Sequence, residues 1–357
     1  MLSNRYLSRW YSIGILLMIA MIAIGGVTRL TNSGLSMVDW EPVSGILPPI
    51  GDSDWENEFN NYKKYPEYKE INMDITISEF KVIFFWEYLH RMVGRILALF
   101  FILPLTYHCL NKSISKVEIR RVLTIIFLII CQGLLGWYMV KSGLRNNPYV
   151  DHIRLMLHFM MAMILISYTY IQYLRKIDTK KDSLNLSYRS SILLFILVLF
   201  QIIFGTFTAG LKAGYIFNTY PLMNGSVFPL DILYNTSMGL LGSIINNLAT
   251  VQYIHRTLGL ILVLWSFYIL MIQYKSRMLK SYDSKLAIIV IIQFVLGVTT
   301  LVTSVNIYYA ILHQINASII VLACIRVIYI NNSSSIYLYK NRKQSLGSSH
   351  MSRTLVV

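Results

Sequence analysis

Long apolar runs constrain this chain more than any other feature of its sequence. Segmentation by apolar run and flanking charge predicts eight helices, at about 10–28, 82–107, 121–140, 153–174, 190–210, 249–273, 286–304 and 308–330. Each run is long enough to cross a hydrocarbon layer of ~30 Å. With 55% hydrophobic and 14% charged residues, the chain also has too little polar material to cover soluble domains. The sequence therefore predicts an all-α polytopic membrane protein.

Basic residues alternate between the two sides of the predicted helices. Lys and Arg gather in the loops on one side, as at Arg120 and Arg121, whereas acids outnumber bases in the first long loop, from Asp39 to Glu79. Because cytoplasmic loops collect Lys and Arg, both termini are predicted to be cytoplasmic, in a bacterial plasma membrane. The net charge of +15 is then an orientation signal and does not indicate binding to nucleic acid.

The second half of the chain repeats the first. The matches are Glu87-Tyr88-Leu89-His90-Arg91 with Gln252-Tyr253-Ile254-His255-Arg256, Gln132 and Gly136 with Gln293 and Gly297, Leu157-His158 with Leu312-His313, and, after one insertion, Gly26 with Gly205. Two units of four spans each share one orientation and are related by an axis along the membrane normal. We expect an N-terminal unit at 1–175, a C-terminal unit at 190–330 and a disordered cytoplasmic tail at 331–357.

Four of the seven histidines, His90, His158, His255 and His313, fall inside predicted spans, on the second and fourth helix of each unit. A lone histidine in a helix is more often a packing residue than a ligand. Four at matching positions in the outer half of the bilayer indicate function, because polar groups in hydrocarbon are costly. Two neutral imidazoles on facing helices are the natural axial pair for a haem iron, so we pair His255 with His313 and His90 with His158. A bare metal is disfavoured, since no Asp, Glu or Cys cluster completes its coordination.

The ordered motifs resemble those of the haem A synthase family, whose members oxidise a methyl group of haem O to the formyl group of haem A. The matching segments are Gly25-Gly26-Val27-Thr28-Arg29-Leu30-Thr31, Ser33-Gly34-Leu35-Ser36, Trp40-Glu41-Pro42, Glu87-Tyr88-Leu89-His90-Arg91, Phe204-Gly205-Thr206-Phe207-Thr208-Ala209-Gly210, Tyr253-Ile254-His255-Arg256 and His313. The first outer loop lacks the cysteine pair of the firmicute branch. The chain therefore resembles the proteobacterial and mitochondrial branch, and a mechanism based on those cysteines cannot apply.

The resemblance implies a role for each histidine pair. It implies that His255 and His313 hold a resident haem B as cofactor. His90 and His158 would address the iron of the substrate haem O, and Glu87 would be essential to turnover. The implied reaction oxidises the C8 methyl group in two successive hydroxylations, through a hydroxymethyl intermediate. Haem O would come from the bilayer, and the pathway implies haem O synthase, a protohaem farnesyltransferase, as a neighbour. The sequence leaves contact with that enzyme and a homo-oligomer open.

Glu87 distinguishes the two units without reference to any family. It lies three residues before His90 on the same helix face, whereas its counterpart in the repeat is the neutral Gln252. A carboxylate beside one histidine pair and an amide beside the other predict chemistry at the first site and electron transfer at the second. An ion pair with Arg91, four residues later, is the structural alternative, and the two roles are compatible.

The sequence also suggests roles for other polar residues and for the glycines of the repeat. Arg91 and Arg256 recur in both units, where a guanidinium can bind haem propionates or lipid phosphates. Arg29, Thr31 and Ser33 are candidates for capping the haem edge. The glycines of the repeat are interpreted as close-packing contacts between helices, without a catalytic role; they are Gly94, Gly136, Gly259 and Gly297.

Two rival functions fit the same histidine pattern. A di-haem b-type cytochrome would keep both haems permanently and alter neither, and a haem transporter or chaperone would leave haem O unchanged. The contrast between Glu87 and Gln252 favours an oxidoreductase that acts on a methyl group of haem O.

Overall fold

The computed structural model describes residues 1–39, 45–145, 147–177, 187–227, 239–279 and 281–351, with side chains as far as Asn332. Eight of its helices are long and apolar enough to cross a membrane, which confirms all eight predicted spans. They are α1 (Asn4–Leu30), α4 (Ile77–Leu110), α5 (Lys116–Gly143), α6 (His152–Leu174), α7 (Tyr188–Gly210), α11 (Leu248–Lys275), α12 (Tyr282–Val302) and α13 (Ile307–Met351), the last spanning with residues 307–332. The chain is an all-α, multi-pass membrane protein.

Polar caps explain where the spanning helices begin. The residue before each of seven helices accepts a hydrogen bond from the backbone N–H three residues on; these caps are Ser3, Thr76, Ser115, Asp151, Ser187, Asn247 and Ser281. Such caps satisfy backbone donors that the first helical turn leaves unpaired. Because the caps precede the apolar runs, the helices begin one to six residues earlier than predicted.

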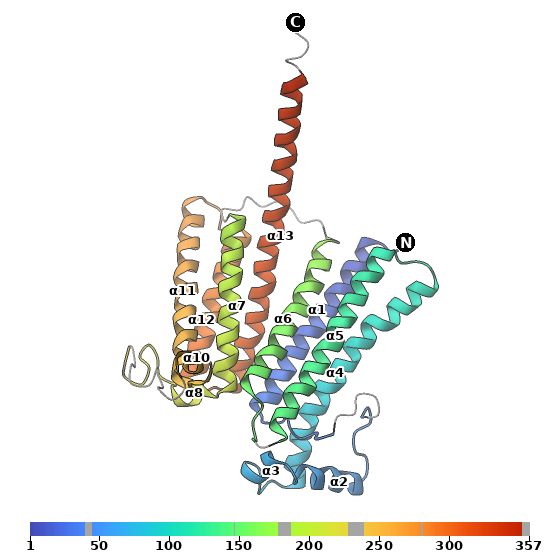
Figure 1. Cartoon of the computed structure of the whole chain (residues 1–357), viewed down its shortest axis with the longest axis vertical. Coiled ribbons are helices and arrows are strands. Elements are labelled where there is room, and N and C mark those ends of the chain that lie inside the picture. The colour runs from blue at the N-terminus through green and yellow to red at the C-terminus, as the bar shows by residue number, and fades with distance from the viewer. Residues whose placement is uncertain (40–44, 146, 178–186, 228–238, 280, 352–357) are drawn as a thin grey trace.

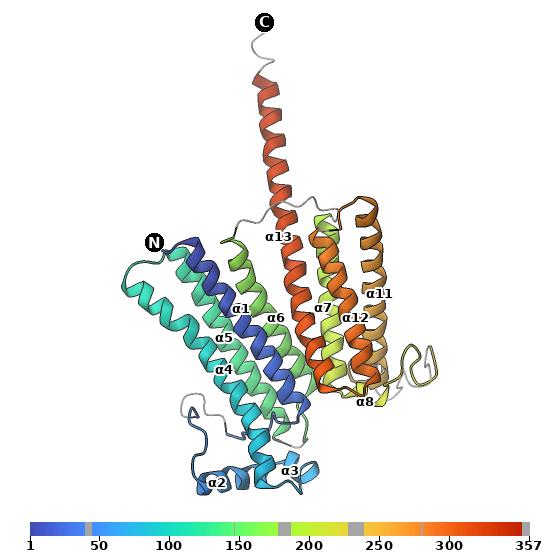
Figure 2. The same cartoon turned by 180° about the vertical axis from the view of Figure 1, so that it is seen from behind.

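The spanning helices form two groups that lie side by side (Figure 1). Helices α1, α4, α5 and α6 make one group, and α7, α11, α12 and α13 make the other, while α1 and α6 pack against α7 and α13. The view from behind shows the same grouping (Figure 2). The two groups follow the order of the helices in the chain; the division into two repeated units and the symmetry axis between them stay predictions.

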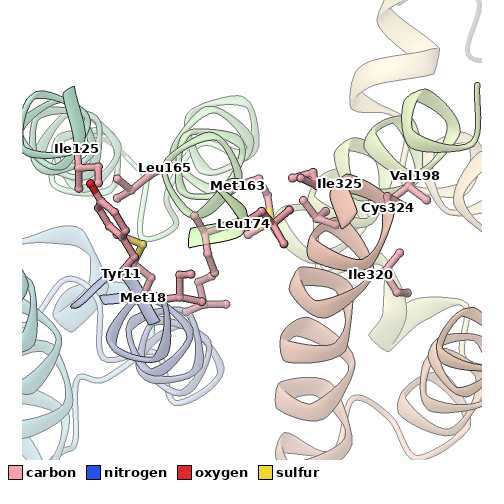
Figure 3. Packing of buried hydrophobic residues seen from close by; sticks show 14 of the residues in the cluster. Tyr11, Met18, Ile125, Met163, Leu165, Leu174, Val198, Ile320, Cys324 and Ile325 are labelled. Atoms are coloured by element: carbon pink, nitrogen blue, oxygen red, sulfur yellow. The ribbon is translucent and has the colours of Figure 1, made fainter. Parts of the chain in front are cut away.

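Apolar side chains and hydrogen bonds join the groups. Met163 and Leu174 of α6 lie opposite Ile325 and Cys324 of α13 (Figure 3). Two of the hydrogen bonds run from Nη1 of Arg29 to the carbonyl of Ala209, at 3.1 Å, and from Nε2 of Gln314 to the carbonyl of Ile22, at 2.8 Å. Large apolar side chains face outward on the same helices, as expected of a surface that meets lipid; examples are Leu16, Phe127, Leu193 and Leu264.

Short helices were not predicted in the loops. The first long loop contains α2 (Asp52–Tyr62) and α3 (Pro66–Glu70), which lie beside the end of α4 (Figure 1). They pack through a small core of Phe59, Tyr62, Phe80 and Phe84. Helices α8 (Ala213–Ile216) and α10 (Gly239–Asn246) lie in the corresponding part of the second half. The motif residues Trp40, Glu41 and Pro42 lie outside the described residues.

The last helix does not end where the sequence predicted. Residues 331–351 continue α13 as a helix, in place of the disordered tail expected from their Ser, Lys and Asn content. Because the membrane-spanning part already supplies the nucleus, each further residue adds a helical hydrogen bond at low cost. The tail residues 352–357 lie outside the described residues.

Candidate functional site

A cavity of about 1130 Å³ runs between the spanning helices and is lined by residues from all eight of them. This volume exceeds the ~300–1,000 Å³ of ordinary small-molecule pockets. His90 of α4, His158 of α6, His255 of α11 and His313 of α13 all line it. The structure therefore brings the four histidines predicted from the repeat to one internal space.

The C-terminal pair, His255 and His313, is oriented by main-chain carbonyls. The ring centres lie 6.5 Å apart, with an angle of 84° between the ring planes. Nδ1 of His255 lies 3.1 Å from the carbonyl oxygen of Gln201, and Nδ1 of His313 lies 3.1 Å from that of Gln293. An Nδ1–H that donates to a carbonyl leaves Nε2 as the free nitrogen and fixes the ring, as in many metal-binding histidines.

The N-terminal pair, His90 and His158, lacks this support. In the part of the chain that the structure describes, Nδ1 of His90 is buried and has no hydrogen-bond partner. Among the same residues, Nδ1 of His158 makes no contact of good hydrogen-bond geometry, although the backbone of Gln132 lies beside the ring. Nε2 of His158 lies 3.3 Å from Nε2 of Gln132. The two pairs thus share residue type and helix position, but differ in how firmly the rings are held.

Each of the four histidines packs its ring edge against a glycine of a neighbouring helix. A methyl group built on that glycine would lie 2.7–3.1 Å from Cε1 of the ring; the pairs are Gly25 with His90, Gly136 with His158, Gly205 with His255 and Gly297 with His313. Contacts this short displace the ring, so a larger residue does not fit. The interpretation of Gly136 and Gly297 as close-packing positions is confirmed, with a histidine as the packing partner.

The contacts also correct the alignment of the repeat. Gly25 occupies the position of Gly205, whereas Gly26 faces the Gln314 side chain in the other group of helices. The sequence alignment paired Gly26 with Gly205, because adjacent glycines cannot be told apart without their contacts. With Gly25 as the match, Met21 occupies the position of Gln201.

Glu87 is buried and ties the chain after α1 to helix α4. Its Oε2 accepts hydrogen bonds from Oγ of Ser36 and from the backbone N–H of Met37, both at 2.8 Å. Its Oε1 lies 2.7 Å from Nη2 of Arg91, the ion pair weighed as the structural alternative. The guanidinium of Arg91 also donates to the carbonyls of Met37 and Asp39. Glu87 and Arg91 both line the cavity, so the ion pair belongs to the wall of the site.

The corresponding residues of the second group are bonded differently. Nη2 of Arg256 donates to the carbonyl of Phe217 at 2.7 Å and to Oε1 of Gln252 at 3.3 Å. Among the described residues, Nε and Nη1 of Arg256 are buried and have no partner. Arg256 therefore has free donors for an anion in the cavity, whereas the Nη atoms of Arg91 are already engaged by protein oxygens.

Two further cations line the cavity where the two groups of helices meet. They are Arg29 of α1 and Lys212, which follows α7. Burial lowers the pKa of Lys212, and the positive charge of Arg29 lowers it further. Thr31 and Ser33, the other candidates for a haem edge, form a hydrogen bond of 2.6 Å with each other.

Helices α2 and α3 contain one further buried carboxyl group, that of Glu67. Glu67 of α3 lies 3.2 Å from the hydroxyl of Tyr62, which donates to it. Burial raises the pKa of Glu67 to about 8, and the charge of Glu87 contributes to the rise. A carboxyl group with this pKa is mostly protonated at neutral pH.

The glutamines beside the histidines are the functional candidates that the sequence reasoning missed. Gln132 and Gln293 served only as markers of the repeat, and Gln201 was not singled out. All three precede a histidine-packing glycine by four residues, which places amide and glycine on one helix face. This spacing, Gln-x-x-x-Gly, was the signal available in the sequence.

The sequence is similar to known proteins over most of its length. Residues 8–325 match the family model of the cytochrome oxidase assembly protein COX15-CtaA. Relatives named heme A synthase occur in Orientia tsutsugamushi (strain Boryong), 39% identical over 89% of this chain and 94% of the relative, and in Wolbachia pipientis wMel, 41% identical over 86% and 87%. That of Pelagibacter ubique (strain HTCC1062) is 37% identical over 92% of this chain and 97% of the relative.

Proposed function

Because the chain belongs to the COX15-CtaA family of cytochrome oxidase assembly proteins and shares the haem A synthase function of its relatives, we propose how its two histidine pairs divide the reaction. His255 and His313 hold haem B as the resident cofactor. His90 and His158 receive the iron of haem O, the substrate, beside Glu87. The observation that carries this proposal is the unequal support of the two pairs by hydrogen bonds.

The C-terminal pair fits a haem on three counts. The ring centres lie 6.5 Å apart and both rings line the cavity, so the two imidazoles would hold the iron of one haem between them. Both rings are oriented through Nδ1, so Nε2 would be the nitrogen that holds the iron. At His313 this Nε2 lies 3.3 Å from Nε2 of Gln293, as Nε2 of His158 does from Nε2 of Gln132. The free donors of Arg256 match the charge of a propionate.

The N-terminal pair suits a group that binds and leaves in every cycle. Nδ1 of His90 has no partner among the described residues, and Nδ1 of His158 has only a poorly aligned contact with the backbone of Gln132, so these rings are less firmly oriented than the C-terminal ones. Glu87 supplies a carboxylate in the cavity wall at this site, where the other site has Gln252. A proton acceptor therefore accompanies only the pair proposed to bind the substrate.

The residues of this site have separable roles in oxidation of the C8 methyl group. Bound haem B supplies one-electron redox chemistry. Each of two successive hydroxylations replaces a C–H bond by C–OH, the first giving a hydroxymethyl group and the second a hydrated aldehyde, which becomes the formyl group by losing water. Each broken C–H bond gives up a proton, which needs an acceptor, and two electrons, which pass to an external electron acceptor. Glu87 accepts a proton, while Arg91, Ser36 and Met37 hold its carboxylate in place.

The chain's product can be measured in a host that lacks haem A. Co-expression with a protohaem farnesyltransferase supplies haem O, and chromatography of the extracted haems should then show haem A. The farnesyltransferase expressed alone is the control and should yield haem O without haem A. Protohaem as the only pigment of the purified protein would favour a di-haem cytochrome, and unchanged haem O would favour a transporter.

We further propose that both termini face the cytoplasm of a bacterial plasma membrane. The basis is the excess of Lys and Arg in alternate loops. A reporter inserted within 176–187 or after Lys343 should report the cytoplasm, and one inserted within 60–70 should report the opposite side. Reversed signals would place the four histidines in the cytoplasmic half of the bilayer and contradict the orientation.

A further inference from the structure

Hydrogen bonds join α12 to α13 at the level of His313. Nδ2 of Asn316 donates to Oε1 of Gln293 at 2.9 Å and to the carbonyl of Ile289 at 3.1 Å. Nε2 of Gln293 donates to the backbone carbonyl of His313 at 3.0 Å, and Nδ1 of His313 lies 3.1 Å from the carbonyl of Gln293. We call these four residues and their contacts the α12–α13 clamp.

The matching helices α5 and α6 do not have this clamp. The repeat places Gln132 at the position of Gln293 and Met161 at the position of Asn316. A methionine thioether cannot donate a hydrogen bond. Among the described residues, Oε1 of Gln132 is accordingly buried without a partner, and its Nε2 contacts only Nε2 of His158, at 3.3 Å. The difference between Asn316 and Met161 thus accounts for the fully hydrogen-bonded amide of Gln293 and the partly bonded amide of Gln132.

We propose that the residue at this position decides whether the neighbouring histidine pair retains or exchanges its haem. Asn316, acting through Gln293, makes the His255–His313 site retentive. Met161 leaves Gln132 and His158 able to rearrange, so that the His90–His158 site takes up haem O and releases its product. The inference rests on the proposed assignment of resident and substrate haems and adds residues that position the ligands.

The physical reason lies in what must move when a haem leaves. The axial histidine has to swing away from the iron, or its helix has to separate from the neighbouring helix. The clamp opposes both motions for His313, because it fixes the ring through Nδ1 and the backbone through the carbonyl. At His158 the amide of Gln132 makes no bond to the backbone carbonyl, and the ring has only a poorly aligned contact with the backbone of Gln132. The buried amide oxygen of Gln132, which has no partner among the described residues, gains from any rearrangement that supplies a donor.

The clamp can be tested by the rate at which purified protein releases haem to apomyoglobin. Asn316→Met introduces the residue that the first half has at the equivalent position. It should accelerate release of the resident haem about tenfold or more, since mutating residues that hydrogen-bond to metal ligands commonly lowers metal affinity ~10–100-fold. Ile319→Met adds the same side chain to an exposed position of α13 and should release haem at the wild-type rate. Release from Asn316→Met at the wild-type rate would overturn the proposal.

The reciprocal variant tests the same idea without weakening the resident site. Met161→Asn gives Gln132 the partner that it lacks. Protohaem is added in slight excess over the resident haem, and the part of its binding that His158→Ala abolishes is assigned to the His90–His158 site. This haem should dissociate from Met161→Asn about tenfold more slowly than from the wild type. An unchanged rate for this added haem would contradict the proposal even if Asn316→Met does not accumulate.

A further variant separates failure of this inference from failure of the proposed function. Loss of the resident haem in His255→Ala supports its assignment to the C-terminal pair. If that variant keeps the haem, the proposed function itself is wrong. If it loses the haem while Asn316→Met and Met161→Asn release haem like the wild type, only the role of the clamp is wrong.

Discussion

Replacing Glu87 by Gln should reduce haem A formation per haem-containing molecule by ~10²–10⁴-fold, the usual effect of losing an acid or base group. The amide keeps the volume of the side chain and one oxygen that can accept from Ser36 and Met37. It loses the ion pair with Arg91, but Arg91 keeps its hydrogen bonds to the carbonyls of Met37 and Asp39, so the wall of the site should stay in place. Haem O or its hydroxymethyl derivative should accumulate. Chromatography of extracted haems, normalised to haem B in the purified protein, measures the effect.

The repeat supplies the matched control for this experiment. Gln252→Glu makes the opposite change at the equivalent position of the second half, where Gln252 is buried against the carbonyls of Ala213 and Phe217. It should not raise haem A formation. If Glu87 serves only its ion pair with Arg91, Glu87→Gln should accumulate poorly while each surviving molecule forms haem A at a near-normal rate. That result would remove Glu87 from the chemistry.

Replacing His255 or His313 by Ala should remove most of the stably bound haem B. Each change deletes one of two axial ligands, together with a ring already oriented by a main-chain carbonyl. His90→Ala and His158→Ala should leave that haem largely bound but abolish haem A formation. The absorption spectrum and haem content of purified protein measure the first effect, and extracted haems measure the second.

His108 provides the control for a histidine within a spanning helix but away from the cavity. Its ring nitrogens lie within hydrogen-bond distance of the hydroxyl groups of Tyr6 and Ser113. His108→Ala should therefore change neither haem content nor haem A formation. Equal loss of haem B from all four cavity variants would contradict the division between resident and substrate pairs.

Local sequence was sufficient for the fold class and the main residues of the cavity. A span depends on transfer of about 20 consecutive side chains into hydrocarbon, so its free energy can be read from one segment without its neighbours. The histidines were equally accessible, since polar residues in such segments are rare and the repeat aligns them. The pairing of His255 with His313 followed from that alignment and agrees with their ring contact.

Packing between helices that are distant in sequence decided how equivalent residues of the two halves differ in their hydrogen bonds. Arg91 and Arg256 occupy equivalent positions, yet only Arg256 has buried donors left without a partner among the described residues. Likewise Gln293 and Gln132 occupy equivalent positions beside His313 and His158, but only Gln293 has a donor for its amide oxygen among the described residues. A hydrogen bond forms or fails over a few tenths of an ångström. That distance is set by the approach of two helices and by side chains such as Asn316 and Met161 between them, which no single segment specifies.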